Sequence, residues 1–74
     1  MRRLLDPDRS LPRDLDRMAR DYARSAVWHS DQHVEAYADL LFRHAHEDSG
    51  SVALALRTRV QFAIYMANEI GWTL

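Results

Sequence analysis

Apolar residues recur at every third or fourth position in three segments of the chain, which is the spacing of one face of an α-helix. The first segment covers residues 12–28, the second begins at residue 30 or 31 and ends near 46, and the third covers 51–70. No internal repeat or strand-like alternation of apolar and polar residues is present. The pattern predicts an all-α fold of three helices.

Residues that favour helix ends separate the three segments. Ser10, Ser30 and Ser51 each stand where an N-cap is needed, and Gly71 suits the left-handed conformation that follows many helices. The stretch EDSGS at 47–51 is the clearest loop. Such short connections favour an up-down-up bundle. Because the junction at Ser30 holds neither Gly nor Pro, one long helix through the first two segments is the alternative.

The chain has 74 residues, of which 47% are hydrophobic, so it can bury one core and fold as one domain. Residues 1–11 include Pro7 and several charges without helical spacing, and we expect a flexible leader there, before a single helical domain at 12–74. A core of this size is marginal alone, and small domains often add disulfides, a metal or a partner subunit. Cysteine is absent, which excludes disulfides and thiolate zinc sites.

The third segment is apolar over roughly 200° of the helical wheel, whereas an ordinary surface helix is apolar over about 100°. One neighbouring helix cannot cover so wide a face. We therefore expect this helix to be the central helix of the bundle or part of a subunit interface, and we predict a homodimer that forms through it. Its apolar positions are Val52, Ala53, Ala55, Leu56, Val60, Phe62, Ala63, Ile64, Met66, Ala67 and Ile70, beside a polar strip of Arg57, Gln61 and Asn68.

Arg59 falls inside this apolar arc, where an unpaired charge would cost several kcal/mol. It must pair with an acid, emerge at an interface, or extend its stem along the core edge to water. Trp28 and Trp72 stand near helix ends, where they either cap the bundle or contact a partner, since Trp and Arg are over-represented in interface hot spots. The predicted contact residues are Trp28, Arg59, Phe62, Met66 and Trp72.

Charge is distributed unevenly along the chain. The formal net charge is −1, which gives no general attraction to nucleic acid or to an anionic membrane. Residues 25–49 nevertheless hold one Arg against five acids, a local charge of −4 with His neutral. We expect this segment to meet a partner protein that is basic, because complementary charge raises the association rate. The predicted acidic surface consists of Asp31, Glu35, Asp39, Glu47 and Asp48.

His29 and His33 are the candidate metal ligands, because residues four apart on a continuous helix share one side. The zinc-protease pattern needs Glu directly after the first His, and Ser30 stands there instead. A catalytic zinc site also needs a third protein ligand, which the spacing does not identify. We therefore predict no metal or cofactor, and a pH-dependent charge is the other hypothesis for these histidines.

Other functional classes find little support in the residues. The chain has no cysteine, no nucleophile-elbow motif and no Gly-rich phosphate loop, so we predict that it is not an enzyme. No apolar run is long enough to span a membrane, and the N-terminus lacks the apolar core of a secretory signal, so a cytoplasmic location is expected. Arg57 and Arg59 could contact DNA phosphates, although net charge argues against it.

Together these patterns predict a small non-enzymatic protein that acts by binding another protein, as a regulator, an inhibitor, an immunity-type protein or an accessory subunit. Binding would use the apolar face of the third helix and the acidic middle segment. A metal-binding protein that uses histidines and a small helical DNA-binding regulator are the two alternatives.

Overall fold

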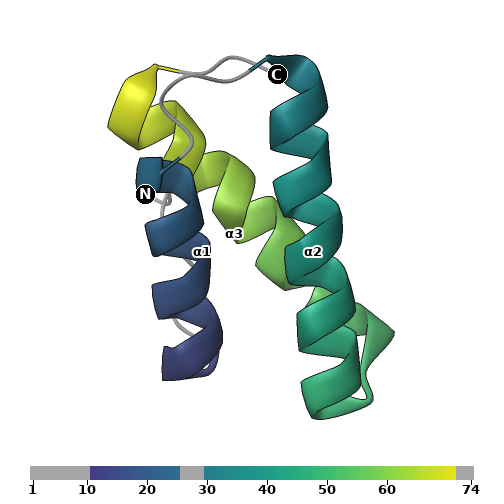
Figure 1. The fold of residues 1–74 in the computed structure, drawn as a ribbon. Helices are drawn as coiled ribbons and strands as arrows, with labels where there is room; N and C mark the ends of the chain where they lie inside the picture. The colour runs from purple at the N-terminus through teal and green to yellow at the C-terminus, as the bar shows by residue number, and fades with distance from the viewer. Residues whose placement is uncertain (1–10, 26–29, 72–74) are drawn as a thin grey trace.

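The computed structural model describes residues 11–25 and 30–71. These residues form three helices, which are α1 (Arg13–Ser25), α2 (Asp31–Ser49) and α3 (Val52–Ile70). The described residues contain no strand, and the all-α prediction is confirmed. The chain reverses direction at each connection, in the predicted up-down-up order (Figure 1). Most of the predicted leader and the last predicted turn of the first helix, residues 26–28, lie outside the described residues.

Polar caps begin α2 and α3. Ser30 has an extended backbone, with φ −89° and ψ 170°, and its hydroxyl accepts a hydrogen bond from the backbone N–H of His33. A helix cannot continue through that conformation, so the alternative of one long helix over the first two segments is wrong. Ser51 caps α3 in the same way, because its hydroxyl accepts from the N–H of Leu54 at 3.1 Å.

Glycines in the left-handed region end the same two helices. Gly50 has φ 70° and Gly71 has φ 71°, and Gly71 thus takes the role that the sequence predicts. The N–H of Gly50 donates to the carbonyl of His46 at 2.7 Å. This bond closes α2 at Ser49, three residues beyond its predicted end, because the acidic pair before Ser49 is compatible with a helix and only the glycine is not.

The three helices form two layers. α1 and α2 stand side by side, and α3 crosses behind both of them (Figure 1). α3 has extensive contacts with each of the other two helices, while α1 and α2 touch each other only slightly. The dimensions of the fold, 33 × 31 × 18 Å, fit two helix layers about 8–10 Å apart. α3 is therefore the central helix, as its wide apolar face predicts, and no helix of the described residues covers the side of α3 that points away from α1 and α2.

The core lies between α3 and the other layer. α1 contributes residues four apart, and the inward positions of α1 and α2 are mostly alanine or medium-sized aliphatic residues. Phe62 and Met66 of α3 fill the space between the two front helices. The buried apolar residues are Leu11, Leu15, Ala19, Ala23, Val34, Ala38, Leu41, Ala45, Ala55, Phe62, Tyr65 and Met66.

The core face of α3 is rotated from the one that the helical wheel predicts. Gln61, assigned to a polar strip, is buried, and so are Thr58 and Tyr65. Thr58 and Tyr65 are tolerated there because their hydroxyls find partners, such as the Leu54 carbonyl that accepts from the Thr58 hydroxyl at 2.8 Å. A count of apolar positions cannot detect such partners. On α2, the large apolar residue Leu40 is exposed.

Candidate protein-binding surface

A row of apolar side chains runs along the side of α3 that faces away from the core. Val52, Leu56 and Val60 follow one another at four-residue intervals and are 54%, 50% and 58% exposed. Residues at this spacing lie on one side of a helix. The smaller or half-buried residues that continue this side are Ala53, Ala63, Ile64 and Ala67. We call these seven residues the outer face of α3.

Such a row differs from the scattered apolar residues of an ordinary surface. Single exposed leucines or valines need no explanation, but aligned ones that form a continuous patch mark interaction sites. The outer face also lies on the helix that already supplies the largest core side chains, so α3 is apolar on two opposite sides. A helix of this kind is typical of a buried position.

Two arginines stand on the flanks of the outer face. Arg59, on the flank next to α2, forms an ion pair with Asp39, with 3.7 Å between Nη2 and Oδ1. Both side chains are largely exposed, so the pair contributes little to folding stability. Arg57 lies on the other flank and is also exposed. Of the outcomes predicted for Arg59, pairing with an acid at the surface is the one observed.

The predicted contact residues are placed very differently. Phe62 and Met66 are only 1% and 0% exposed, since they belong to a buried cluster that includes residues of α1 and α2. Their assignment as surface contact residues is therefore wrong, because a partner cannot reach them unless the helices separate. Trp28 and Trp72 lie outside the described residues. Of the five, Arg59 alone is a described surface residue.

The predicted acidic residues are all exposed and belong to α2. Asp31, Glu35 and Asp39 follow one another at four-residue steps along one side of the helix, and we call them the acidic row. Glu47 and Asp48 lie in the last turn, two steps or more beyond Asp39, and do not extend the row without interruption. The structure thus brings three of the five acids together and leaves two apart.

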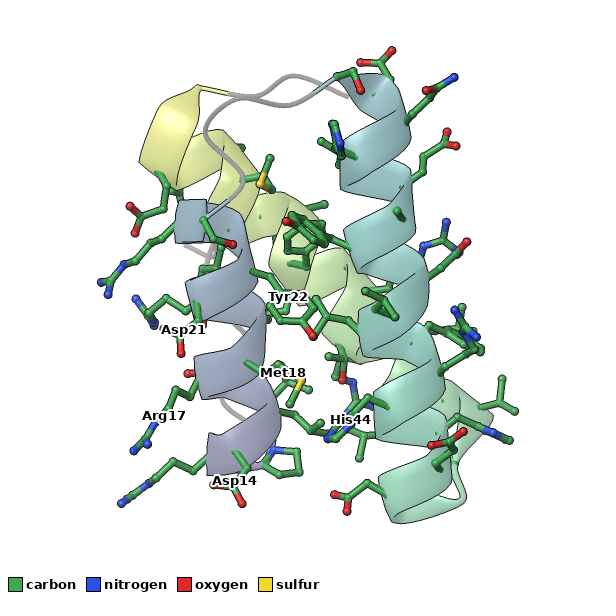
Figure 2. All side chains as sticks on the ribbon, viewed as in Figure 1. Asp14, Arg17, Met18, Asp21, Tyr22 and His44 are labelled. Carbon is green, nitrogen blue, oxygen red and sulfur yellow. The ribbon has the colours of Figure 1, made fainter. Side chains whose placement is uncertain are left out.

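The histidines do not form a site within the described residues. His29 lies outside them, and the extended backbone of Ser30 removes the continuous helix on which a shared side for His29 and His33 depended. The ring of His46 stacks on Phe42 at 6.2 Å, and His44 points from α2 toward α1 (Figure 2). Among residues 11–25 and 30–71, no group of three His, Asp or Glu side chains could hold a metal ion.

A polar network joins α1 to α3, and the sequence pattern does not reveal it. The hydroxyl of Tyr65 donates to the carboxylate of Asp16 and accepts from Nη2 of Arg20 at 3.1 Å. The Arg20 guanidinium also lies 4.5 Å from the centre of the Tyr65 ring. Asp16 and Arg20 also form an ion pair with each other four residues apart on α1, at 3.8 Å, and both contact Tyr65 of α3.

The environment of Tyr65 decides what this network can do. Burial, and then the hydrogen bond and negative charge of Asp16, raise the pKa of Tyr65, while Arg20 opposes that change. The hydroxyl therefore keeps its proton, which it donates to the Asp16 carboxylate. A buried tyrosine needs a partner for its hydroxyl, and this is the one signal in the sequence that points to such a network.

Comparison with known proteins adds no further information on function. No family model, curated protein or solved structure matches the chain. None of the described helices combines the length and the apolar character needed to cross a membrane. The outer face of α3 is the candidate site that the described residues support best.

Proposed function

We propose that the chain is a small non-enzymatic protein that acts by binding protein, and that the outer face of α3 is the surface on which two copies associate. The observation that carries this proposal is the exposure of Val52, Leu56 and Val60 along one side of the central helix. None of the three described helices covers that side, and a second copy would supply a further layer.

The apolar area supports a dimer of modest affinity. Complete burial of a Val or Leu side chain contributes about 1.5–3 kcal/mol, so covering the exposed half contributes about 1 kcal/mol per residue. Two copies would bury six such half-exposed side chains, about 6 kcal/mol, against an association cost that begins near 4 kcal/mol. The smaller side chains of the outer face add to the difference. A net gain of about 2 kcal/mol alone corresponds to a dissociation constant of tens of millimolar, and about 2 kcal/mol more from the smaller side chains brings it near a millimolar, which is the affinity we expect.

The acidic row of α2 supports a second part of the proposal. Asp31 and Glu35 are exposed, and they lie on a different helix from the outer face. A dimer formed through α3 therefore presents two acidic rows to the solvent. Such a surface favours a basic protein as the eventual partner, and salt should slow that association more than it weakens the final complex.

Light scattering over a concentration series tests the proposal. The chain mass is 8.7 kDa, and we expect the average mass to rise toward twice that value between about 10 µM and about 1 mM. Leu56→Glu should keep the mass at the monomer value. Leu40→Glu is the matched control, because Leu40 is 43% exposed against 50% for Leu56 but lies on α2. A monomer at all concentrations, or equal effects of the two substitutions, would refute the proposal.

The two alternatives from the sequence stay predictions. A metal-binding protein would show a higher melting temperature with zinc, and His33→Ala would abolish the increase. A DNA-binding regulator would be retained on duplex DNA in a salt-dependent manner. No contact among the described residues favours either alternative over protein binding.

A further inference from the structure

The spacing along the outer face of α3 follows the pattern of a coiled-coil seam. Ala53, Leu56, Val60, Ala63 and Ala67 are separated alternately by three and four residues. This is the spacing of the a and d positions of a heptad, which keeps about one side chain per turn directed toward a partner helix. The side chains at these positions are exposed or half-buried, so neither α1 nor α2 buries the seam.

The order of large and small residues along the seam discriminates between two ways of pairing. Leu56 and Val60 lie in the first half of α3, and Ala63 and Ala67 lie in the second half. If two α3 helices packed in parallel, the large residues would meet each other and the alanines would meet alanines. The helices would be held apart at one end and would leave voids at the other, whereas packed protein interiors have few voids.

An antiparallel pairing removes this mismatch. With the two-fold axis between residues 61 and 62, Leu56 faces Ala67 of the second copy, and Val60 faces Ala63 of the second copy. Each layer then contains one large and one small side chain, and the separation of the helices is the same in every layer. Because the interface is two-fold symmetric, each of these contacts occurs two times.

The charges on one flank are compatible with the same symmetry. The Asp39–Arg59 ion pair places one negative and one positive group on the flank next to α2. A two-fold axis places the flank next to α2 of one copy beside the same flank of the other copy. Asp39 and Arg59 of both copies then lie along that one side of the interface. A surface that carries one charge of each sign is complementary to its own rotated copy, whereas a purely basic flank would repel it.

We propose that two copies of the chain pair through antiparallel α3 helices, with Leu56 of each copy packed against Ala67 of the other. This inference rests on the proposed function, since it specifies the partner of the outer face and its orientation. The absence of cysteine from the chain makes the geometry accessible to disulfide mapping, because each introduced cysteine is the sole thiol.

The test uses full-length Leu56→Cys and Ala67→Cys, one of them carrying a tag so that mixed and self disulfides differ in size. Disulfides need Cα atoms about 4.4–6.8 Å apart. In the antiparallel pairing, Leu56 of one copy lies 11 residues along the helix from Leu56 of the other, about 16 Å at 1.5 Å per residue. We therefore expect the mixture to give the mixed disulfide several-fold more than either variant gives a self disulfide.

Controls separate this inference from the proposed function. Ala36→Cys, an exposed alanine replaced on α2, measures disulfides from random collision. Self disulfides of Leu56→Cys that exceed the mixed product would show parallel pairing and overturn the inference. Mixed disulfides no more frequent than those of the control, in a sample that light scattering shows to be dimeric, would also overturn it and leave the dimer standing. A monomeric sample would overturn both.

Position 67 is half-buried, and if Ala67→Cys loses its helical circular dichroism, a measurement on Leu56→Cys alone replaces the disulfide test. A spin label on Leu56→Cys alone reports the distance between the two copies of position 56. Labels separated by about 16 Å or more are expected, from the same 1.5 Å rise per residue. Strong coupling between labels in close contact would mean parallel pairing and would contradict the inference.

Discussion

Tyr65→Phe removes one hydroxyl from the α1–α3 network and leaves the packing of the ring in place. The substitution removes the hydrogen bond that Tyr65 donates to Asp16 and the one that it accepts from Arg20. The contact of the Arg20 guanidinium with the aromatic ring remains. Hydrogen bonds to charged groups contribute about 1.5–3 kcal/mol when buried. Asp16 and Arg20 keep 32% and 41% of their side-chain surface exposed, so water can replace part of the loss.

We therefore expect Tyr65→Phe to lower the free energy of unfolding by about 1–2 kcal/mol after this correction for hydration. For a chain of this length, 1 kcal/mol corresponds to about 4–8 °C in melting temperature. Urea unfolding followed by circular dichroism measures the change. Tyr37→Phe is the matched control, since Tyr37 lies on α2 and is partly exposed, and its change should stay within about 0.5 kcal/mol.

A double-mutant cycle with Asp16→Asn assigns the loss to the contact between the two residues. If the hydrogen bond to Asp16 causes the effect, the sum of the stability losses of the two single variants should exceed the stability loss of the double variant by about 0.5–2 kcal/mol. Additive losses, or a Tyr65→Phe variant as stable as the original chain, would refute the account of the network. The same cycle with Tyr37→Phe in place of Tyr65→Phe should be additive.

Three further predictions concern pH and the helix ends. The pKa of Tyr65 is raised from its unfolded value of 10.0, so the stabilisation by its protonated hydroxyl is fully present below pH 10 and is lost as pH rises through the higher folded pKa. In urea unfolding, the free energy of unfolding should therefore fall above pH 10, and Tyr65→Phe should reduce that fall. Gly50→Ala should cost about 1 kcal/mol in thermal unfolding, because φ is 70° and nothing lies within 4 Å of an added Cβ, so backbone strain is the sole penalty. Ser30→Ala should lower the free energy of unfolding by about 1 kcal/mol, because α2 loses its N-cap. The His33 amide should then exchange its hydrogen faster, and an unchanged exchange rate would contradict the role of the cap.

Helix ends follow from local chemistry, and for this reason the sequence predicts them well. Ser30, Ser51 and Gly71 take the capping roles that their residue types imply. These roles depend on a few neighbouring backbone groups, and no distant part of the chain is needed to identify them. The predicted end of α2 lies three residues too early, because the pattern places Glu47 and Asp48 in a loop although their residue types are compatible with a last helical turn.

The core face of α3 could not be predicted from apolar positions because both sides of the helix are apolar. Phe62 and Met66 were assigned to the surface, whereas Leu56 and Val60 occupy it. The choice between the two sides depends on polar partners, above all the Asp16 carboxylate for Tyr65, that come from a different helix. Periodicity detects an apolar side of one helix but contains no information about which side the other helices cover.

The sequence therefore predicts contact residues on a side of α3 that the structure buries, and the binding site itself stays a prediction. The width of the apolar arc indicated that α3 has more apolar surface than its neighbours can cover. The structure shows that the uncovered part is the side of Val60, opposite Phe62. The acidic residues of α2 were easier to place, because exposed charges on an amphipathic helix lie opposite its buried stripe.

Backbone amide NMR on dilution tests the central claim most directly, because it shows which residues meet a second copy. Between about 1 mM and about 10 µM, we expect concentration-dependent shifts at Leu56, Val60 and Ala63, with Leu40 on α2 unchanged. Shifts confined to α2, or none over the whole range, would contradict association through the outer face of α3.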